Sequence, residues 1–112
     1  MSDPVAQLRE FALSLPAATE EITWGHPTFR VGGKIFATCG SAPGSTATMS
    51  VKSTKDVQPE LLAKPGFFRP DYVGSKGWVG IELDGRVPWA EIEPLVERAW
   101  ALTAPKRLQR GR

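Results

Sequence analysis

The sequence contains few of the residues that crosslink a chain, bind metals or cross a membrane. Its 112 residues include one cysteine, one histidine and one tyrosine. The lone Cys39 cannot form an internal disulfide, which agrees with a reducing compartment, so we expect a cytoplasmic protein. The apolar runs are far shorter than the roughly 20 residues that a membrane helix needs. The N-terminus also lacks a signal-peptide pattern.

Composition and charge are those of one globular domain with an unevenly distributed net charge of +2. The length and the 41% hydrophobic content fit one domain, which we assign to 1–104. Residues 26–80 carry seven Lys or Arg against three acids, while the segments on either side are acidic. Residues 105–112 are basic, and we expect a disordered tail there. Solvated surface charge is the default interpretation, and a polyanionic partner is the alternative.

Hydrophobic periodicity predicts a helix first and short strands after it. Apolar residues recur at helical spacing over 4–14, and Pro16 ends that helix. The β-branched and aromatic content of four segments predicts strands: 21–24, 28–31, 34–38 and 47–51. The pair Gly32-Gly33 indicates a hairpin turn, because a primed turn needs positive φ. These short connections favour an antiparallel meander.

The second half of the chain predicts a short helix near Pro59, a loop over 67–75 and a strand over 77–83. A last helix follows, and because Pro94 would break an interior turn, we expect it to begin at about 90–93. The predicted order is α-βββ(β)-α-β(β)-α. Helices at both ends and in the middle must cover one face of the sheet, so the fold class is α+β, a two-layer sandwich with an antiparallel meander sheet.

The sequence shows no catalytic, metal or cofactor motif. Gly32-Gly33-Lys34 leads into a strand, whereas a Walker phosphate loop opens a helix. The neighbours of Cys39 offer no charge that would lower the pKa of its thiol. His26, between Gly25 and Pro27, has no metal partners at ligand spacing; it either fixes the loop by hydrogen bonds or contacts a ligand, and catalysis is a third reading. We expect a non-enzymatic domain.

Several segments together resemble the MmcQ/YjbR family of predicted DNA-binding proteins. They are Leu13-Ser14-Leu15-Pro16, Thr23 to Val31 with its Trp-Gly-His-Pro, Gly33 to Ala37, Met49 to Lys52, Pro65-Gly66-Phe67, Tyr72 and Gly77-Trp78-Val79. The resemblance covers about residues 5–103. It implies a compact α+β domain similar to frataxin-like or secretion-chaperone-like folds, together with a DNA-binding label that rests on fold analogy.

Two binding hypotheses follow, and neither identifies the ligand or the oligomeric state. In the first, nucleic acid is bound through phosphate contacts, with Trp78 stacking if its ring is exposed rather than packed under a loop. The candidate residues are Arg30, Lys34, Lys52, Arg69, Lys76 and Trp78. In the second, a small molecule or a protein partner occupies an aromatic pocket. Its candidate residues are Trp24, His26, Phe29, Tyr72 and Trp78.

Overall fold

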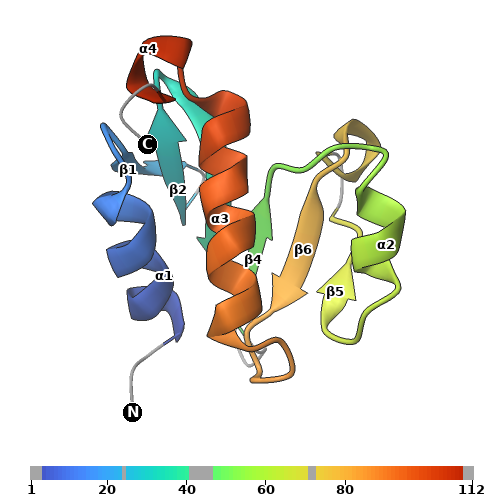
Figure 1. Ribbon diagram of the computed structural model, residues 1–112. Helices are drawn as coiled ribbons and strands as arrows, with labels where there is room; N and C mark the ends of the chain where they lie inside the picture. Colours follow the sequence, from blue (N-terminus) through green and yellow to red (C-terminus); the bar gives the residue numbers. More distant parts are fainter. Residues whose placement is uncertain (1–3, 24, 41–46, 71–72, 110–112) are drawn as a thin grey trace.

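An antiparallel sheet with helices packed on it forms the protein in the computed structural model, which describes residues 4–23, 25–40, 47–70 and 73–109 (Figure 1). The elements are α1 (Pro4–Ser14), β1 (Thr19–Thr23), β2 (His26–Val31), β3 (Lys34–Gly40), β4 (Thr48–Val51), α2 (Gln58–Leu62), β5 (Phe67–Phe68), the 3-10 helix η1 (Val73–Lys76), β6 (Val79–Glu82), α3 (Trp89–Thr103) and α4 (Lys106–Gln109). This architecture confirms the predicted α+β class. None of the described helices is long and apolar enough to cross a bilayer.

The sheet has six strands in the order β1-β2-β3-β4-β6-β5, and every pair is antiparallel. The first four strands form the predicted meander. The sheet then continues with β6, which pairs Val79 with Val51, and ends with β5 at the edge. Strand β5 was predicted as part of a loop, because two residues are too few to show the alternation of a strand.

The hairpin between β2 and β3 has the predicted glycine turn. Gly32 and Gly33 have φ of 61° and 79°, the left-handed region that a primed turn requires. The register between these strands shifts after Phe29, which pairs with Ala37 although the next residue of β2 pairs with Ile35. Phe36 is therefore an extra residue in β3, a β-bulge, and both Phe36 and Ala37 are fully buried.

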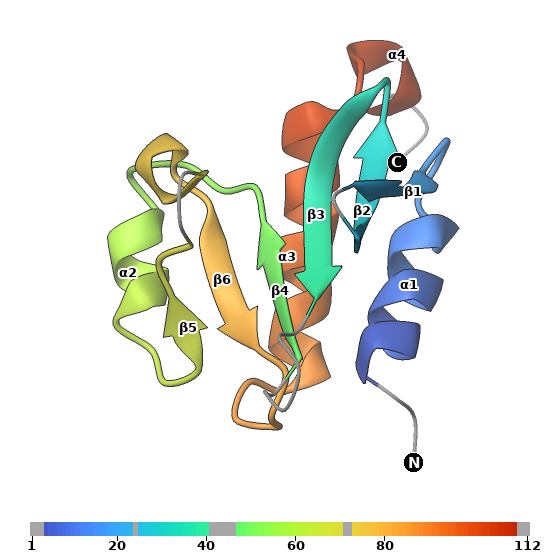
Figure 2. The same ribbon diagram turned by 180° about the vertical axis from the view of Figure 1, so that it is seen from behind.

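The core lies between one face of the sheet and the helices α1 and α3. Val96, Ala99 and Trp100 of α3 pack there against strand residues such as Phe29 and Val51. Figure 2, from behind, shows β3 and β4 in front of α3 with no helix covering them. The short α2 lies at the β5 edge of the sheet, beside β5 and β6 (Figures 1 and 2), and adds Leu61 to the same core.

Two expectations for the C-terminal part are wrong. Helix α3 begins at Trp89, which places Pro94 inside the helix. The proline removes the N–H that would bond to the carbonyl of Ala90, and both residues are exposed, so water can reach that carbonyl. Residues 105–112 were predicted to be a disordered tail, yet Lys106–Gln109 forms α4, with Leu108 packed against the core. Residues 110–112 lie outside the described residues.

Candidate nucleic-acid interface

A row of small residues crosses the face of the sheet that lies away from α1 and α3. Val79 and Ile81 face the core, so the alternation of β6 turns Gly80 to the other side. The register places Thr28, Thr38, Ser50 and Gly80 in one row across four strands. The hydroxyls of Thr38 and Ser50 are hydrogen-bonded to each other at 2.6 Å. This row is polar but uncharged.

Two rings lie on glycines of this face. A Cβ on Gly80 would lie 2.4 Å from the ring of Phe68, and one on Gly40 would lie 2.5 Å from Nδ1 of His26. His26 is therefore an exposed side chain whose ring rests on the next strand. Among the described residues there is no cluster of His, Cys, Asp or Glu that could hold a metal ion.

Four of the predicted cations lie at one end of the sheet rather than on its face. In the register of the sheet, Lys52 lies one residue beyond the Val51–Val79 pair, and Arg69 lies one residue beyond the Phe68–Gly80 pair. Lys34 begins β3 at that end, and Lys76 closes η1 just before β6. We call Lys34, Lys52, Arg69 and Lys76 the basic end. None of them forms an ion pair with another described residue.

The loops of the basic end are held by contacts that the sequence did not reveal. The buried side chain of Gln58 donates from Nε2 to the carbonyls of Gly74 and Trp78, both at 2.8 Å. A Cβ on Gly74 would lie 2.6 Å from Cγ of Arg69, so the aliphatic part of this arginine lies along the glycine. These contacts fix η1 against β6 and give Arg69 a defined path.

The loop between β4 and α2 adds charge of both signs to this end. Lys55 is exposed there and is a cation that the prediction omitted. Asp56 follows it and reduces the net positive charge. The charge surplus of residues 26–80 was a signal for Lys55, but only the fold shows which cations share one end.

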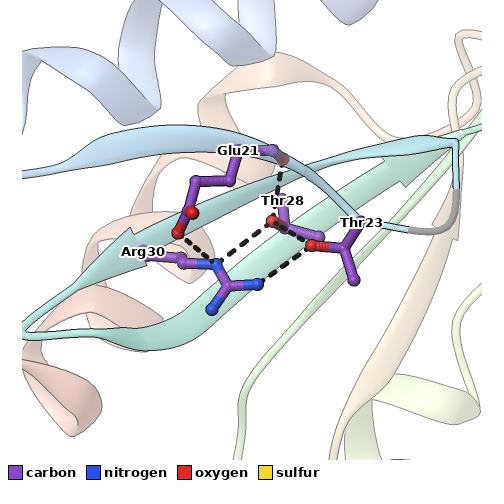
Figure 3. A network of polar contacts seen from close by, with 4 residues as sticks. All are labelled: Glu21, Thr23, Thr28 and Arg30. Carbon is purple, nitrogen blue, oxygen red and sulfur yellow. Dashed lines mark hydrogen bonds and ion pairs between the residues drawn. The ribbon is translucent and has the colours of Figure 1, made fainter.

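Arg30 is not part of the basic end, because its guanidinium is bound to residues of β1 and of its own strand β2 (Figure 3). Its Nε lies 2.9 Å from Oε2 of Glu21, and one NH2 group donates to the hydroxyl of Thr23 at 2.9 Å. The same Nε lies 3.4 Å from the hydroxyl of Thr28, which is only 4% exposed. Arg30 therefore neutralises Glu21 and covers Thr28.

Trp78 points away from the helices, as the strand alternation predicted, but it is only 8% exposed and does not belong to the core under the helices. The hypothesis that Trp78 offers an exposed ring for stacking is therefore wrong, and the alternative, a ring packed under a loop, agrees with its burial. The segments that approach it, Gln58 and η1, bond to its backbone: its carbonyl accepts from Gln58 and its N–H donates to the carbonyl of Val73.

The residues proposed for an aromatic pocket do not gather in the described structure. Phe29 is fully buried and faces the helices, and His26 lies on the opposite face. Trp24 and Tyr72 lie outside the described residues. A shallow groove of about 440 Å³ lies elsewhere, between α1 and α3, and includes none of the predicted residues. It is lined by Phe11, Ala90, Glu93, Pro94, Glu97, Arg98 and Ala101.

The opposite end of the sheet carries acids paired with an arginine. Arg86 forms ion pairs with Glu82 and with Asp84, whose Oδ2 lies 2.8 Å from Nε of Arg86. The backbone N–H of Arg86 also donates to Asp84 at 3.1 Å. These bonds, the backbone one first, lower the pKa of Asp84. Among the described residues of this end, Arg86, Glu82 and Asp84 therefore satisfy one another's charges.

An open antiparallel sheet with helices on one face defines a class of small α+β domains. Within that class, the model of the YjbR family matches residues 13–102, so the chain belongs to the YjbR family. This confirms the resemblance found in the sequence. A comparison with curated proteins found no match.

Two crystal structures show the same fold. A Deinococcus radiodurans protein with a DUF419 domain has a TM-score of 0.78 at 24% identity, over 91% of this chain and 81% of that chain. A Pseudomonas syringae protein has a TM-score of 0.78 at 20% identity, over 92% of this chain and 99% of that chain. At these identities the likeness concerns the fold alone.

Proposed function

We propose that this protein is a non-enzymatic, cytoplasmic domain that binds nucleic acid through phosphate contacts at its basic end. One observation carries the proposal: the topology brings Lys34, Lys52, Arg69 and Lys76 to the same end of four adjacent strands. Arg30 is left out because Glu21 already pairs with it. Trp78 is left out because its ring is buried.

The spacing of these cations suits an extended polyanion. Neighbouring strands lie about 4.8 Å apart, so β3, β4, β6 and β5 distribute the charges over roughly 15 Å. A nucleic acid backbone presents several phosphates over that length, because each strand carries one charge per about 3.4 Å. A single phosphorylated metabolite would reach only part of this row.

Recognition at the basic end is expected to be independent of sequence. Lysine contacts phosphate as a point charge, and phosphate contacts position a protein without reading bases. Among the described helices only α4 directly follows another helix, and its four residues are too few for a recognition helix; the basic end consists of loops and strand ends. We therefore expect modest affinity that falls steeply with salt.

The test measures binding to a fluorescently labelled DNA duplex at a series of salt concentrations, with fluorescence anisotropy as the readout. For wild type, the four cations of the basic end should contribute about −3.6 to the slope of log K against log salt, since each phosphate contact contributes about −0.9. The triple variant Lys34→Ser, Lys52→Ser, Lys76→Ser should reduce the magnitude of the slope by about 2.7 and abolish binding near physiological salt.

The matched control is Lys64→Ser. Lys64 is an exposed lysine that precedes β5 at the opposite end of the sheet, so its loss should leave slope and affinity unchanged. Circular dichroism of all variants checks that the fold is kept. The absence of wild-type binding at low salt would refute the proposal, as would a triple variant that binds like wild type.

A further inference from the structure

Helix α4, the last helix that the structure describes, is attached to the turn between β2 and β3. The family match ends at residue 102, so this segment lies beyond the shared pattern. Ala104 is buried and donates its N–H to the carbonyl of Trp100 at 2.7 Å, which ends α3. Pro105 then turns the chain into α4, the four residues Lys106–Gln109.

Two apolar contacts hold this segment. A Cβ on Gly32 would lie 3.1 Å from Cδ and 3.2 Å from Cγ of Pro105, so the proline ring rests on the glycine turn. Leu108 packs against the core, and its N–H donates to the carbonyl of Pro105 at 3.0 Å. Gly32 permits this approach because it has no side chain, and its positive φ makes the turn.

The contact places two more cations beside the basic end. Lys106 follows Pro105 directly, and Lys34 lies two residues after Gly32. Lys106 and Arg107 are exposed, whereas Pro105 and Leu108 are partly buried. The apolar residues of the segment thus attach it, and its charged residues face the solvent.

We propose that residues 105–109 are a docked arm that extends the polyanion site, with Lys106 and Arg107 contacting the phosphates next to those held by Lys34. This inference rests on the proposed function and adds a positioning role for Pro105, Leu108 and Gly32. A docked arm presents its charges in place, whereas a free tail would lose conformational entropy on binding.

The first pair of variants separates charge from docking. Lys106→Ser with Arg107→Ser removes two charges from an arm that stays docked, and should reduce the magnitude of the salt slope by about 1.8. Leu108→Ser keeps both charges but releases the arm. It should weaken duplex binding roughly fivefold at low salt, because the arm must then be ordered on binding. Amide hydrogen exchange over 104–109 should become faster in Leu108→Ser and stay unchanged in the variant Lys106→Ser with Arg107→Ser.

A second pair tests the glycine contact. Gly32→Asn and Gly33→Asn both place asparagine, which tolerates positive φ, in the same turn. At Gly32 the new Cβ meets Pro105, whereas at Gly33 it meets nothing within 4 Å. Faster exchange in the arm and weaker duplex binding are therefore expected for Gly32→Asn and not for Gly33→Asn.

The outcomes distinguish this inference from the proposed function. If the Lys34, Lys52 and Lys76 variant loses binding while all arm variants bind like wild type, the docked arm is refuted and the basic end stands. Unchanged exchange in both Leu108→Ser and Gly32→Asn would refute the anchoring contacts. If wild type itself does not bind the duplex, the proposed function fails first.

Discussion

The two ends of the sheet carry charges in different states. At one end, Arg86 is paired with both Glu82 and Asp84. At the basic end, Lys34 and Lys76 form no ion pair with any described residue. Exposed ion pairs add little to stability, so this difference concerns what each end can bind more than how firmly it folds.

The comparison shows that net charge is a poor guide to a binding surface. Residues 26–80 contain Arg30 as well as Lys34 and Lys52, yet Arg30 is engaged by Glu21 from the next strand. A cation is available to a ligand only if the fold has not already given it a partner. The predictions below test the two ends against each other.

The largest difference is expected for backbone packing at two glycines with similar φ. Gly77 (φ 99°) lies against the basic-end loop, where a Cβ would be 2.9 Å from the backbone of Thr54 and Lys55. Gly85 (φ 94°) lies at the paired end, with nothing within 4 Å. Gly77→Ala should lower the free energy of unfolding by about 3 kcal/mol or more, and Gly85→Ala by about 1 kcal/mol. Urea unfolding measures both, and equal losses would contradict the packing argument.

Smaller effects are expected for Arg30 and Lys52, where one substitution should lower stability and the other should weaken duplex binding. Arg30→Ala removes the bonds to Glu21 and Thr23 and should cost about 1–2 kcal/mol of stability while leaving duplex affinity unchanged. Lys52→Ala should change stability by less than about 0.5 kcal/mol and reduce the magnitude of the salt slope by about 0.9. Urea unfolding measures the stability of both variants, and anisotropy measures their duplex binding. If Arg30→Ala weakened binding and Lys52→Ala did not, Arg30 and not Lys52 would belong to the interface.

The smallest effect concerns the pKa of Asp84. Its pKa is lowered first by the backbone N–H of Arg86 and then by the side chain of that residue. Because the folded pKa lies below the unfolded one, the contribution to stability is present above about pH 4 and is lost as the pH falls through the folded pKa. Arg86→Ala should raise the pKa of Asp84 only part of the way to its ordinary value, since the hydrogen bond from the backbone N–H of residue 86 remains. NMR titration of the Asp84 carboxyl checks this, with Lys52→Ala as the unaffected control.

Much of the fold could be predicted from the sequence because local signals agreed with it. Helical spacing marked 4–14, and Gly32-Gly33 marked the hairpin. The strand β5 and the helix α4 could not be predicted, because each depends on a distant contact. Phe68 packs on Gly80, and Leu108 packs on the core.

The candidate site was predictable as a set of residues and not as a surface. The lysines could be named from charge, but their common end follows from the order of the strands. The pairing of Arg30 follows from the register that sets Glu21 opposite Thr28. Alternation gave the side of the sheet on which Trp78 lies, whereas its burial depends on how the chain around Gln58 and η1 packs.

The bond from the indole N–H of Trp100 to the carbonyl of Pro16 spans 84 positions at 2.9 Å and joins the last long helix to the end of the first. During synthesis, the sheet would therefore emerge from the ribosome with its apolar face bare until α3 has left the exit tunnel. Nascent chains arrested on the ribosome before residue 96 are expected to be sensitive to protease and to need chaperones. Chains that extend beyond residue 104 and have been released from the ribosome are expected to resist protease.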